Sequence, residues 1–164
     1  QTRLPLLSCR PGLSELLLPG GSRVFAPSGG VRRGADLWFC REAIAAEATK
    51  FIGLRYLWGG TSSYGFDCSG FVMRLFQSQG IFIPRDADEQ FQYGQPIEDG
   101  EGICGDLVFF APGRDPKAIH HVGMIVNNHA MIHSPHSRAA ITVTPWREGS
   151  YGRELTGIRR YRAN

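Results

Sequence analysis

Cys68 stands where a catalytic nucleophile would be expected, between a glycine-rich loop and an amphipathic run. It belongs to an Asp-Cys-Ser-Gly sequence that follows Gly59 and Gly60 and precedes the apolar residues of 71–76. A thiol in the first turn of a helix lies near unpaired backbone N–H groups, whose partial positive charge favours the thiolate. The alternative is a small buried hydrophobic residue, which is the more common role of a free cysteine.

Two histidines further along the chain favour the nucleophile. A thiol peptidase needs an imidazole to accept and return the thiol proton, and a third polar group to hold this imidazole in one tautomer. His121 begins one apolar run and His133 ends the next. If Asn127 and Asn128 make a tight hairpin, His121 lies directly opposite His133 on one face of a sheet. A register one residue longer would place Val122 opposite His133 instead.

Four other polar residues are expected outside the reacting group. His120 faces the other side of the strand that begins with His121, because successive side chains of a strand alternate. His129 lies in the expected hairpin loop and His136 in the loop that follows. Asp106 precedes a strand, where it is expected to make a structural turn hydrogen bond.

The elements that would position these residues change character along the chain. Apolar residues recur at helical spacing over 41–52, and Gly53 is suited to end that helix. A second helix, capped by Asp67 or Ser69 and ended by Gly80, would carry the thiol. Helices followed by antiparallel strands make an α+β domain, with N-terminal helices packed on an antiparallel sheet. The later pattern predicts a short helix over 87–93 and strands over 107–110, 122–126, 131–133, 141–143 and 155–161.

Residues 1–40 differ in composition and are expected to be a partial, β-rich segment. Short apolar pieces at 16–18, 24–25 and 37–39 are separated by proline and glycine turns. Such a segment is too short to close a barrel, so we expect it to be the end of a larger structural unit. Residues 41–164 would then form the catalytic domain.

Composition argues against several classes of protein. The net charge is only +3, without a run of basic residues, which argues against a nucleic-acid partner. No apolar stretch approaches the roughly 20 residues that span a membrane. Four cysteines without CxxC spacing indicate neither a zinc site nor a disulfide framework, and we expect no metal. The chain begins with Gln1 and lacks a signal-peptide pattern, so we expect a processed product or a fragment.

Motifs in a fixed order carry a more specific resemblance. They read Tyr-Leu-Trp-Gly-Gly at 56–60, Asp-Cys-Ser-Gly-Phe-Val at 67–72, Ile-Pro-Arg at 83–85, Gly-Asp-Leu-Val-Phe-Phe at 105–110, and His-Val-Gly-Met at 121–124 through Ile-His-Ser at 132–134. Over roughly residues 41–162 the chain thus resembles the NlpC/P60 cysteine peptidases. The resemblance implies a papain-like α+β fold and no cofactor. It also implies hydrolysis of bacterial peptidoglycan peptides, commonly between D-γ-glutamate and diaminopimelate or lysine.

The resemblance also implies roles for the reacting residues. Cys68 would be the nucleophile, His121 the general base and then acid, and His133 the orienting residue. The backbone N–H of Cys68 can stabilise the tetrahedral oxyanion, and Tyr56 could donate the second hydrogen bond. Losing one such donor typically lowers the rate by about 10²–10³.

Four residues are expected to bind the substrate. Arg85 suits the free α-carboxylate of γ-linked glutamate, and Ser69 could share it. The carboxylate of Asp67 opposes thiolate formation, so we expect it to cap the helix or bind a substrate ammonium. Trp58 would line the cleft. In the family a serine follows the arginine by two residues, whereas here that position is Ala87.

Other functions stay open. A related acyltransferase would use the same residues with an apolar tunnel, a metal protein could use Cys68, His121 and His133 as ligands, and a catalytically silent module could bind the cell wall. In many relatives a small bacterial Src-homology-type barrel covers the free amino terminus of the substrate. Residues 1–40 resemble at most the tail of such a barrel, so we expect less selective binding of short muropeptides.

The expected partners are peptidoglycan stem peptides or muropeptides, and the expected oligomeric state is a monomer. The bacterial cell envelope or secretion is favoured, with cytoplasmic muropeptide recycling as the alternative. The sequence does not distinguish between diaminopimelate and lysine.

Overall fold

The chain divides into two compact units, residues 1–38 and residues 39–164. The computed structural model describes residues 4–31 and 39–162. All residues expected to take part in catalysis lie in the larger unit. None of the helices in the described ranges is long and apolar enough to cross a membrane.

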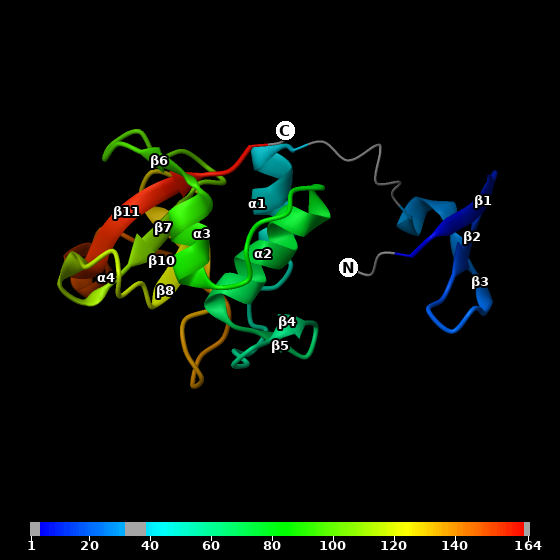
Figure 1. The fold of residues 1–164 in the computed structure, drawn as a ribbon, viewed down its shortest axis with the longest axis horizontal. Coiled ribbons are helices and arrows are strands. Elements are labelled where there is room, and N and C mark those ends of the chain that lie inside the picture. The colour runs from blue at the N-terminus through cyan, green and yellow to red at the C-terminus, as the bar shows by residue number, and fades with distance from the viewer. Residues whose placement is uncertain (1–3, 32–38, 163–164) are drawn as a thin grey trace. The chain divides into compact units, whose positions relative to one another are not determined.

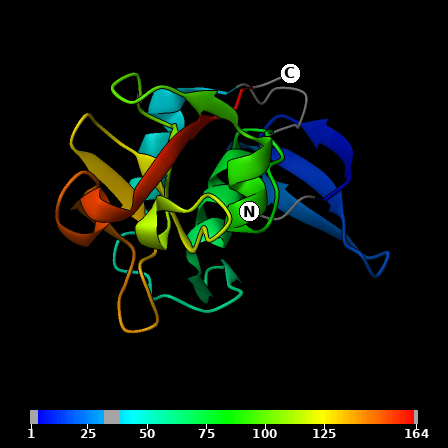
Figure 2. The ribbon, with the colours of Figure 1, turned by 60° about the vertical axis from the view of Figure 1, so that its left-hand side comes forward.

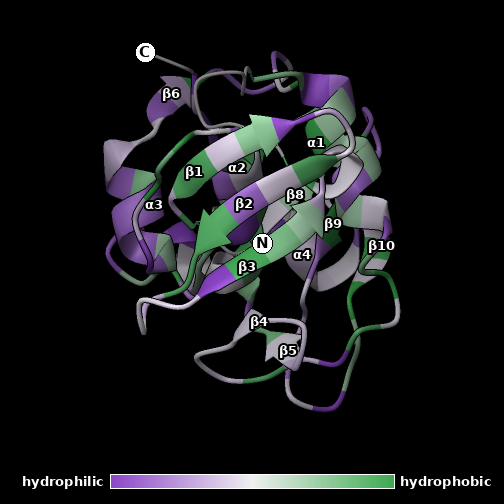
Figure 3. Cartoon of the chain, turned by 90° about the vertical axis from the view of Figure 1, so that its right-hand side faces the viewer, coloured by the Kyte–Doolittle hydropathy of each residue, from purple (hydrophilic) through white to green (hydrophobic). Residues whose placement is uncertain are grey.

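The smaller unit is a three-stranded antiparallel sheet. Its strands, in spatial order, are β1 (Leu6–Arg10), β2 (Leu13–Leu17) and β3 (Arg23–Pro27), followed by a 3-10 turn at Ser28–Gly30. Gly12 and Gly21 each have a φ of +81° in the two turns, a conformation that glycine adopts without steric cost. Figure 3 shows the three strands side by side, with hydrophobic positions in each. The apolar piece expected at 37–39 lies mostly outside the described residues.

The larger unit contains the three predicted helices and one that was not predicted. They are α1 (Arg41–Thr49), α2 (Cys68–Ser78), α3 (Ala87–Tyr93) and α4 (Gly149–Glu154). α1 ends three residues earlier than predicted, because the chain turns after Thr49 toward Gly53, which has a φ of +88°. α4 has only six residues and none of them is buried. Its sequence therefore lacks the helical periodicity of hydrophobic residues from which a helix could be predicted.

A six-stranded sheet forms the second half of the larger unit, and every pair in it is antiparallel. Its order is β10-β9-β8-β7-β11-β6, with β6 (Gln95–Ile97), β7 (Leu107–Phe110), β8 (His121–Ile125), β9 (Ala130–His133), β10 (Thr142–Pro145) and β11 (Leu155–Arg160). The five predicted strands match to within two residues. The strand that was missed, β6, contains Pro96 and lies at the edge, where a proline is tolerated. A separate two-stranded ribbon pairs β4 (Thr61–Ser62) with β5 (Gly65–Phe66).

Both faces of the sheet are buried, which explains why β7 is apolar at every position. Leu107 and Phe109 pack in one core cluster with Phe71 of α2, whereas Val108 and Phe110 pack in a second cluster on the other face. Helices and sheet form the two layers of an α+β fold, as predicted (Figure 1 and Figure 2). α2 packs directly on β8, which brings the start of the helix to the strand that His121 begins.

The predicted register of the β8–β9 hairpin is wrong by two residues. The ladder pairs Met124 with Ile132, and continuing it places Gly123 opposite His133. The loop is longer than a two-residue turn, because the side chain of Asn127 accepts hydrogen bonds from the backbone N–H groups of His129 and Ala130. A register offset of two residues leaves each side chain on the same face of the sheet, so His121 and His133 still point to one face.

Asp106 has the structural role that was predicted, with two additional partners. Its carboxylate accepts the turn hydrogen bond from the backbone N–H of Ile103 at 2.9 Å. The same fully buried carboxylate also accepts hydrogen bonds from Arg41 of α1 at 3.0 Å and from Arg160 of β11 at 2.7 Å. It therefore links the first helix to the last strand.

Candidate active site

The start of α2 presents Cys68 as its first residue. Asp67 is the N-cap, and its Oδ1 accepts a hydrogen bond from the backbone N–H of Gly70 at 2.7 Å, as predicted. The glycine-rich loop packs closely here, because the backbone N–H of Asp67 donates to the carbonyl of Gly60 at 3.2 Å. A Cβ at position 70 would lie 2.3 Å from that carbonyl oxygen, so only glycine allows the approach.

His121 and His133 form a hydrogen-bonded pair on the buried part of the sheet. Nε2 of His121 lies 2.8 Å from Nδ1 of His133, and Nε2 of His133 lies 3.1 Å from Oγ1 of Thr144 on β10. If His121 accepts a proton at Nδ1, its Nε2 carries hydrogen and donates to His133, which in turn donates to Thr144. The chain of contacts is therefore compatible with the tautomer that a general base requires.

The thiol of Cys68 lies at the start of β8, beside His121. The backbone N–H of Val122 is close enough to stabilise the thiolate of Cys68. Val122 follows His121 directly, and Tyr151, whose ring packs against His121, also interacts electrostatically with Cys68, so the thiol lies near His121. Because Nε2 of His121 faces His133, Nδ1 is the nitrogen left to exchange a proton with Cys68.

Burial disfavours the charged forms of Cys68, His121 and His133. It raises the pKa of the Cys68 thiol, and the carboxylate of Asp67 raises it further, although backbone N–H groups at the helix start oppose both effects. Burial also lowers the pKa of His121 well below its usual range and lowers the pKa of His133 to about 4. The backbone N–H groups at the helix start favour the thiolate, as expected, but desolvation is the larger effect and the pKa of the thiol is raised overall.

A polar cluster of Asp67, Ser69 and Arg85 borders the thiol. The guanidinium of Arg85 makes a two-pronged ion pair with the carboxylate of Asp67 and donates to Oγ of Ser69 at 2.9 Å. About a third of the Arg85 side chain is exposed. The fully buried Gln90 of α3 holds the cluster in place, since its Nε2 donates to the carbonyls of Ser69 at 3.1 Å and Pro84 at 2.8 Å.

Tyr56 and Trp58 enter from the loop before α2. Tyr56 is half-buried, and its pKa is raised by burial and by the neighbouring Cys68 and Asp67, which places its hydroxyl in the same electrostatic environment as the thiol. Trp58 is 87% exposed, so its indole lies on the surface and outside the core.

Tyr151 of α4 is a site residue that sequence reasoning missed. Its ring centroid lies 5.6 Å from that of His121, 5.2 Å from that of His133 and 5.0 Å from that of Phe110. A tyrosine in an exposed six-residue helix has no local signal of such a role. Only the packing of α4 against the sheet brings it to the two histidines.

A sequence comparison agrees with this geometry. The model of the NlpC/P60 family matches residues 53–160, which include the thiol, both histidines and the polar cluster. The chain belongs to the NlpC/P60 family. Its catalytic-type residues thus lie within a domain whose fold is known.

Two curated NlpC/P60 relatives are similar over almost the whole chain. The gamma-D-glutamyl-L-lysine dipeptidyl-peptidase of Bacillus cereus is 36% identical over 98% of the chain, and that of Bacillus subtilis is 38% identical over 97%. The match covers 49% and 53% of those proteins, so the chain spans about half the length of these relatives. A crystal structure of an NlpC/P60 family protein from Bacillus cereus matches 98% of this chain and 54% of its own, with a TM-score of 0.89 and 36% identity.

The remaining histidines of the NlpC/P60 domain are exposed, whereas His121 and His133 are buried. Nε2 of His120 lies 2.9 Å from a carboxylate oxygen of Glu154, and more than half of the His120 side chain is exposed. His129 and His136 are exposed in loops. Within residues 4–31 and 39–162, no cluster of three or more His, Cys, Asp or Glu side chains could hold a metal ion.

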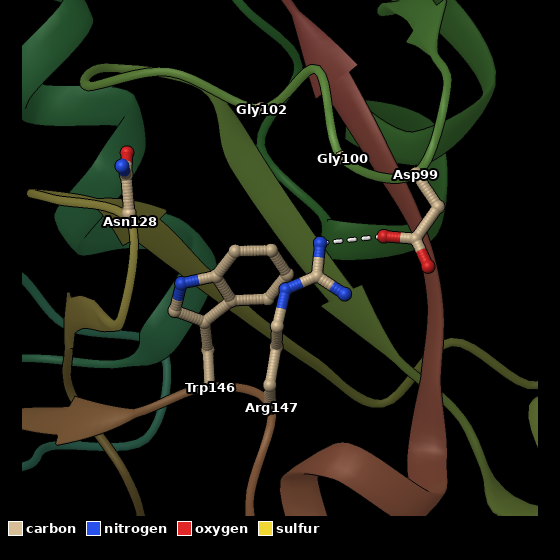
Figure 4. A pocket seen from close by; sticks show the side chains of 6 residues that line it. All are labelled: Asp99, Gly100, Gly102, Asn128, Trp146 and Arg147. Atoms are coloured by element: carbon tan, nitrogen blue, oxygen red, sulfur yellow. Dashed lines mark hydrogen bonds and ion pairs between the residues drawn. The ribbon is translucent and has the colours of Figure 1, made fainter.

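A pocket near the hairpin loop of the domain contains no nucleophile. Asn128, Trp146 and Asp99 line it, and the guanidinium of Arg147 lies 4.0 Å from the indole centroid while it pairs with Asp99 at 2.5 Å (Figure 4). This pocket is at the end of the β8–β9 hairpin opposite to His121 and His133. It offers no group that could attack a peptide, so the candidate site is the one around Cys68.

Proposed function

We propose that this chain is a cysteine peptidase that hydrolyses peptidoglycan-derived peptides at the bond between D-γ-glutamate and a diamino acid. The observation that carries the proposal is the hydrogen-bonded pair of His121 and His133 beside the thiol of Cys68. The printed names of the two Bacillus relatives favour lysine over diaminopimelate as the diamino acid.

The first half of the reaction forms an acyl-enzyme. Nδ1 of His121 accepts the thiol proton as the sulfur of Cys68 attacks the γ-carbonyl carbon. The backbone N–H of Cys68 and the hydroxyl of Tyr56 donate hydrogen bonds to the oxyanion. When the C–N bond breaks, His121 returns the proton to the leaving α-amine of the diamino acid, and the glutamyl group stays on sulfur as a thioester.

The second half regenerates the thiol. Water attacks the thioester carbonyl while Nδ1 of His121 accepts its proton, and the sulfur then leaves and regains that proton. His133 and Thr144 hold the imidazole in one tautomer through both halves. The lowered pKa of His121 suits this cycle, because it favours the unprotonated imidazole that accepts the thiol proton.

The polar cluster of Asp67, Ser69 and Arg85 is proposed to bind the acyl part of the peptide. The exposed part of the Arg85 guanidinium and the hydroxyl of Ser69 would hold the α-carboxylate of D-glutamate. Asp67, already paired with Arg85, would attract the ammonium of the preceding residue. The exposed indole of Trp58 would lie at the rim of the cleft.

Mass spectrometry of the products from L-Ala-γ-D-Glu-L-Lys tests the proposal. We expect L-Ala-D-Glu and free lysine, abolished by Cys68→Ala and by iodoacetamide but not by EDTA. Cys104→Ala removes a half-buried cysteine outside the site and serves as the matched control. Full turnover by Cys68→Ala, or loss of activity with EDTA alone, would show that the thiol mechanism is wrong.

The same assay distinguishes the other functions. An acyltransferase would form an amide when a primary amine is added, and a silent wall-binding module would retain the peptide without cleaving it.

We also propose that residues 1–40 are the end of a bacterial Src-homology-type barrel and residues 41–164 the peptidase domain. The antiparallel sheet of β1–β3 supports the first assignment.

A further inference from the structure

The short helix α4 carries two side chains toward the catalytic histidines. The ring of Tyr151 packs against both imidazoles, at centroid distances of 5.6 Å from His121 and 5.2 Å from His133. One turn later, a carboxylate oxygen of Glu154 lies 2.9 Å from Nε2 of His120, the residue before His121. The aromatic ring therefore lies against the general base, and the carboxylate lies against the residue that precedes it.

α4 is held rigidly in this position. The guanidinium of Arg114 donates to the carbonyls of Gly152 and Arg153, each at 3.1 Å. Arg114 itself has a φ of +60°, an unfavourable conformation for a residue other than glycine. A Cβ at Gly152 would lie 2.2 Å from the carbonyl oxygen of Arg147, so the helix also packs closely on the chain before it.

Two tyrosines near the thiol have different charged neighbours. Tyr56 interacts electrostatically with Cys68 and with the charges of Asp67 and Arg85. Tyr151 interacts with Cys68 and with Glu154. If the cluster of Asp67, Ser69 and Arg85 binds the acyl part of the peptide, the region around α4 is free to bind the leaving group. The leaving group is the diamino acid, whose amine takes up the proton from His121.

We propose that Tyr151 and Glu154 bind the departing diamino acid, with the tyrosine ring against its aliphatic side chain and the carboxylate accepting a hydrogen bond from its terminal ammonium. This inference rests on the proposed function, since it names the group recognised on the far side of the scissile bond. Only one oxygen of Glu154 is engaged by His120, and among the described residues the other oxygen has no side-chain donor. The carboxylate is about one-third exposed, so a ligand can reach it.

The size of the expected effect follows from this exposure. A charge-assisted hydrogen bond to a partly exposed carboxylate contributes modestly, because water competes for both partners. We expect about a 3- to 10-fold preference in kcat/KM for a peptide with the ammonium over one without it.

Two peptides that differ only in the ammonium test the inference. L-Ala-γ-D-Glu-L-Lys is compared with L-Ala-γ-D-Glu-L-norleucine, whose side chain lacks the charged group. Glu154→Gln is expected to lower the ratio of kcat/KM for the lysine peptide to kcat/KM for the norleucine peptide by about 3- to 10-fold. Glu154→Asp keeps the charge and should retain part of the preference. Glu148→Gln, an exposed carboxylate just before the same helix, is the matched control and should retain all of it.

The outcomes separate this inference from the proposed function. An equal loss on both peptides, or no loss on either, would show that Glu154 does not recognise the ammonium although the enzyme cleaves the bond. If the wild-type protein cleaved neither peptide, the proposed function itself would be wrong, and the inference with it. Should Glu154→Gln fail to fold, as judged by circular dichroism, the comparison of Glu154→Asp with Glu148→Gln gives the decision.

Discussion

His121 and His133 share a hydrogen bond of 2.8 Å although they are not opposite each other in the β8–β9 ladder. Gly123 is the residue opposite His133, and a Cβ there would lie 2.5 Å from Sδ of Met131 and 3.3 Å from Cβ of His133. The glycine thus leaves room for the imidazole of His133 to lean along the sheet and reach His121. The pair depends on a diagonal contact as much as on the strand register.

Thr144 is expected to matter for catalysis because it completes the hydrogen-bonded chain from the general base. Thr144→Val keeps the shape but removes the acceptor of the His133 proton, so His133 no longer has one preferred tautomer. We expect kcat/KM to fall roughly 10-fold, as for the loss of one hydrogen bond at a site of reaction. Steady-state kinetics with Thr144→Ser, which retains the hydroxyl, provides the control. Equal rates for the valine and serine variants would contradict this role.

Alkylation of Cys68 should become faster as the pH rises through neutrality and beyond 9. Burial and the charge of Asp67 raise the pKa of this thiol above its ordinary value of 9.0, and only the thiolate reacts with iodoacetamide. Asp67→Asn retains an N-cap but removes the like charge, so its rate profile should move to lower pH.

Intact-protein mass spectrometry measures these rates, and Cys68→Ala reports the background from the other three cysteines. A rate that is already constant by pH 7 would instead indicate a thiolate–imidazolium pair in the resting protein.

Folding stability should decrease as the pH falls from 6.5 toward 4. The pKa of His133 is lowered from its ordinary value of 6.5 to about 4 by burial, so the unfolded chain binds a proton in this range before the folded one does. The stabilisation is fully present above pH 6.5 and is lost as pH falls through the folded value. His133 alone should account for roughly 2 kcal/mol between pH 7 and pH 5.

Urea denaturation at both pH values measures this loss. His133→Gln should reduce the pH dependence, whereas substitution of the exposed His129 by Gln should leave it unchanged. A free energy of unfolding independent of pH over this range would mean that His133 is not protected from protonation.

Asp106→Asn is expected to destabilise the domain by roughly 3 kcal/mol, because it leaves two arginines next to a buried amide. The carboxylate of Asp106 is fully buried and pairs with Arg41 and Arg160. Asp99→Asn breaks the pair of a largely exposed carboxylate with Arg147 and should cost less than about 1 kcal/mol. Chemical denaturation compares the two variants. Similar losses for both would show that the Asp106 network does not hold the first helix to the last strand.

Local chemistry was sufficient to predict much of the site. The N-cap at Asp67, the helix that starts at Cys68 and the apolar runs of β7 and β8 depend on residue types within a few positions of one another. The shared face of His121 and His133 could also be predicted, since an even offset leaves the faces unchanged.

Tertiary structure decided what depends on burial and on distant partners. The offset of the β8–β9 ladder follows from the conformation of one loop, and Thr144 and Tyr151 reach the histidines only because β10 and α4 return to them. The backbone N–H groups at the helix start favour the thiolate of Cys68, but burial of the thiol has the larger effect and raises its pKa. Desolvation depends on everything that surrounds a group, and no short stretch of sequence contains that information.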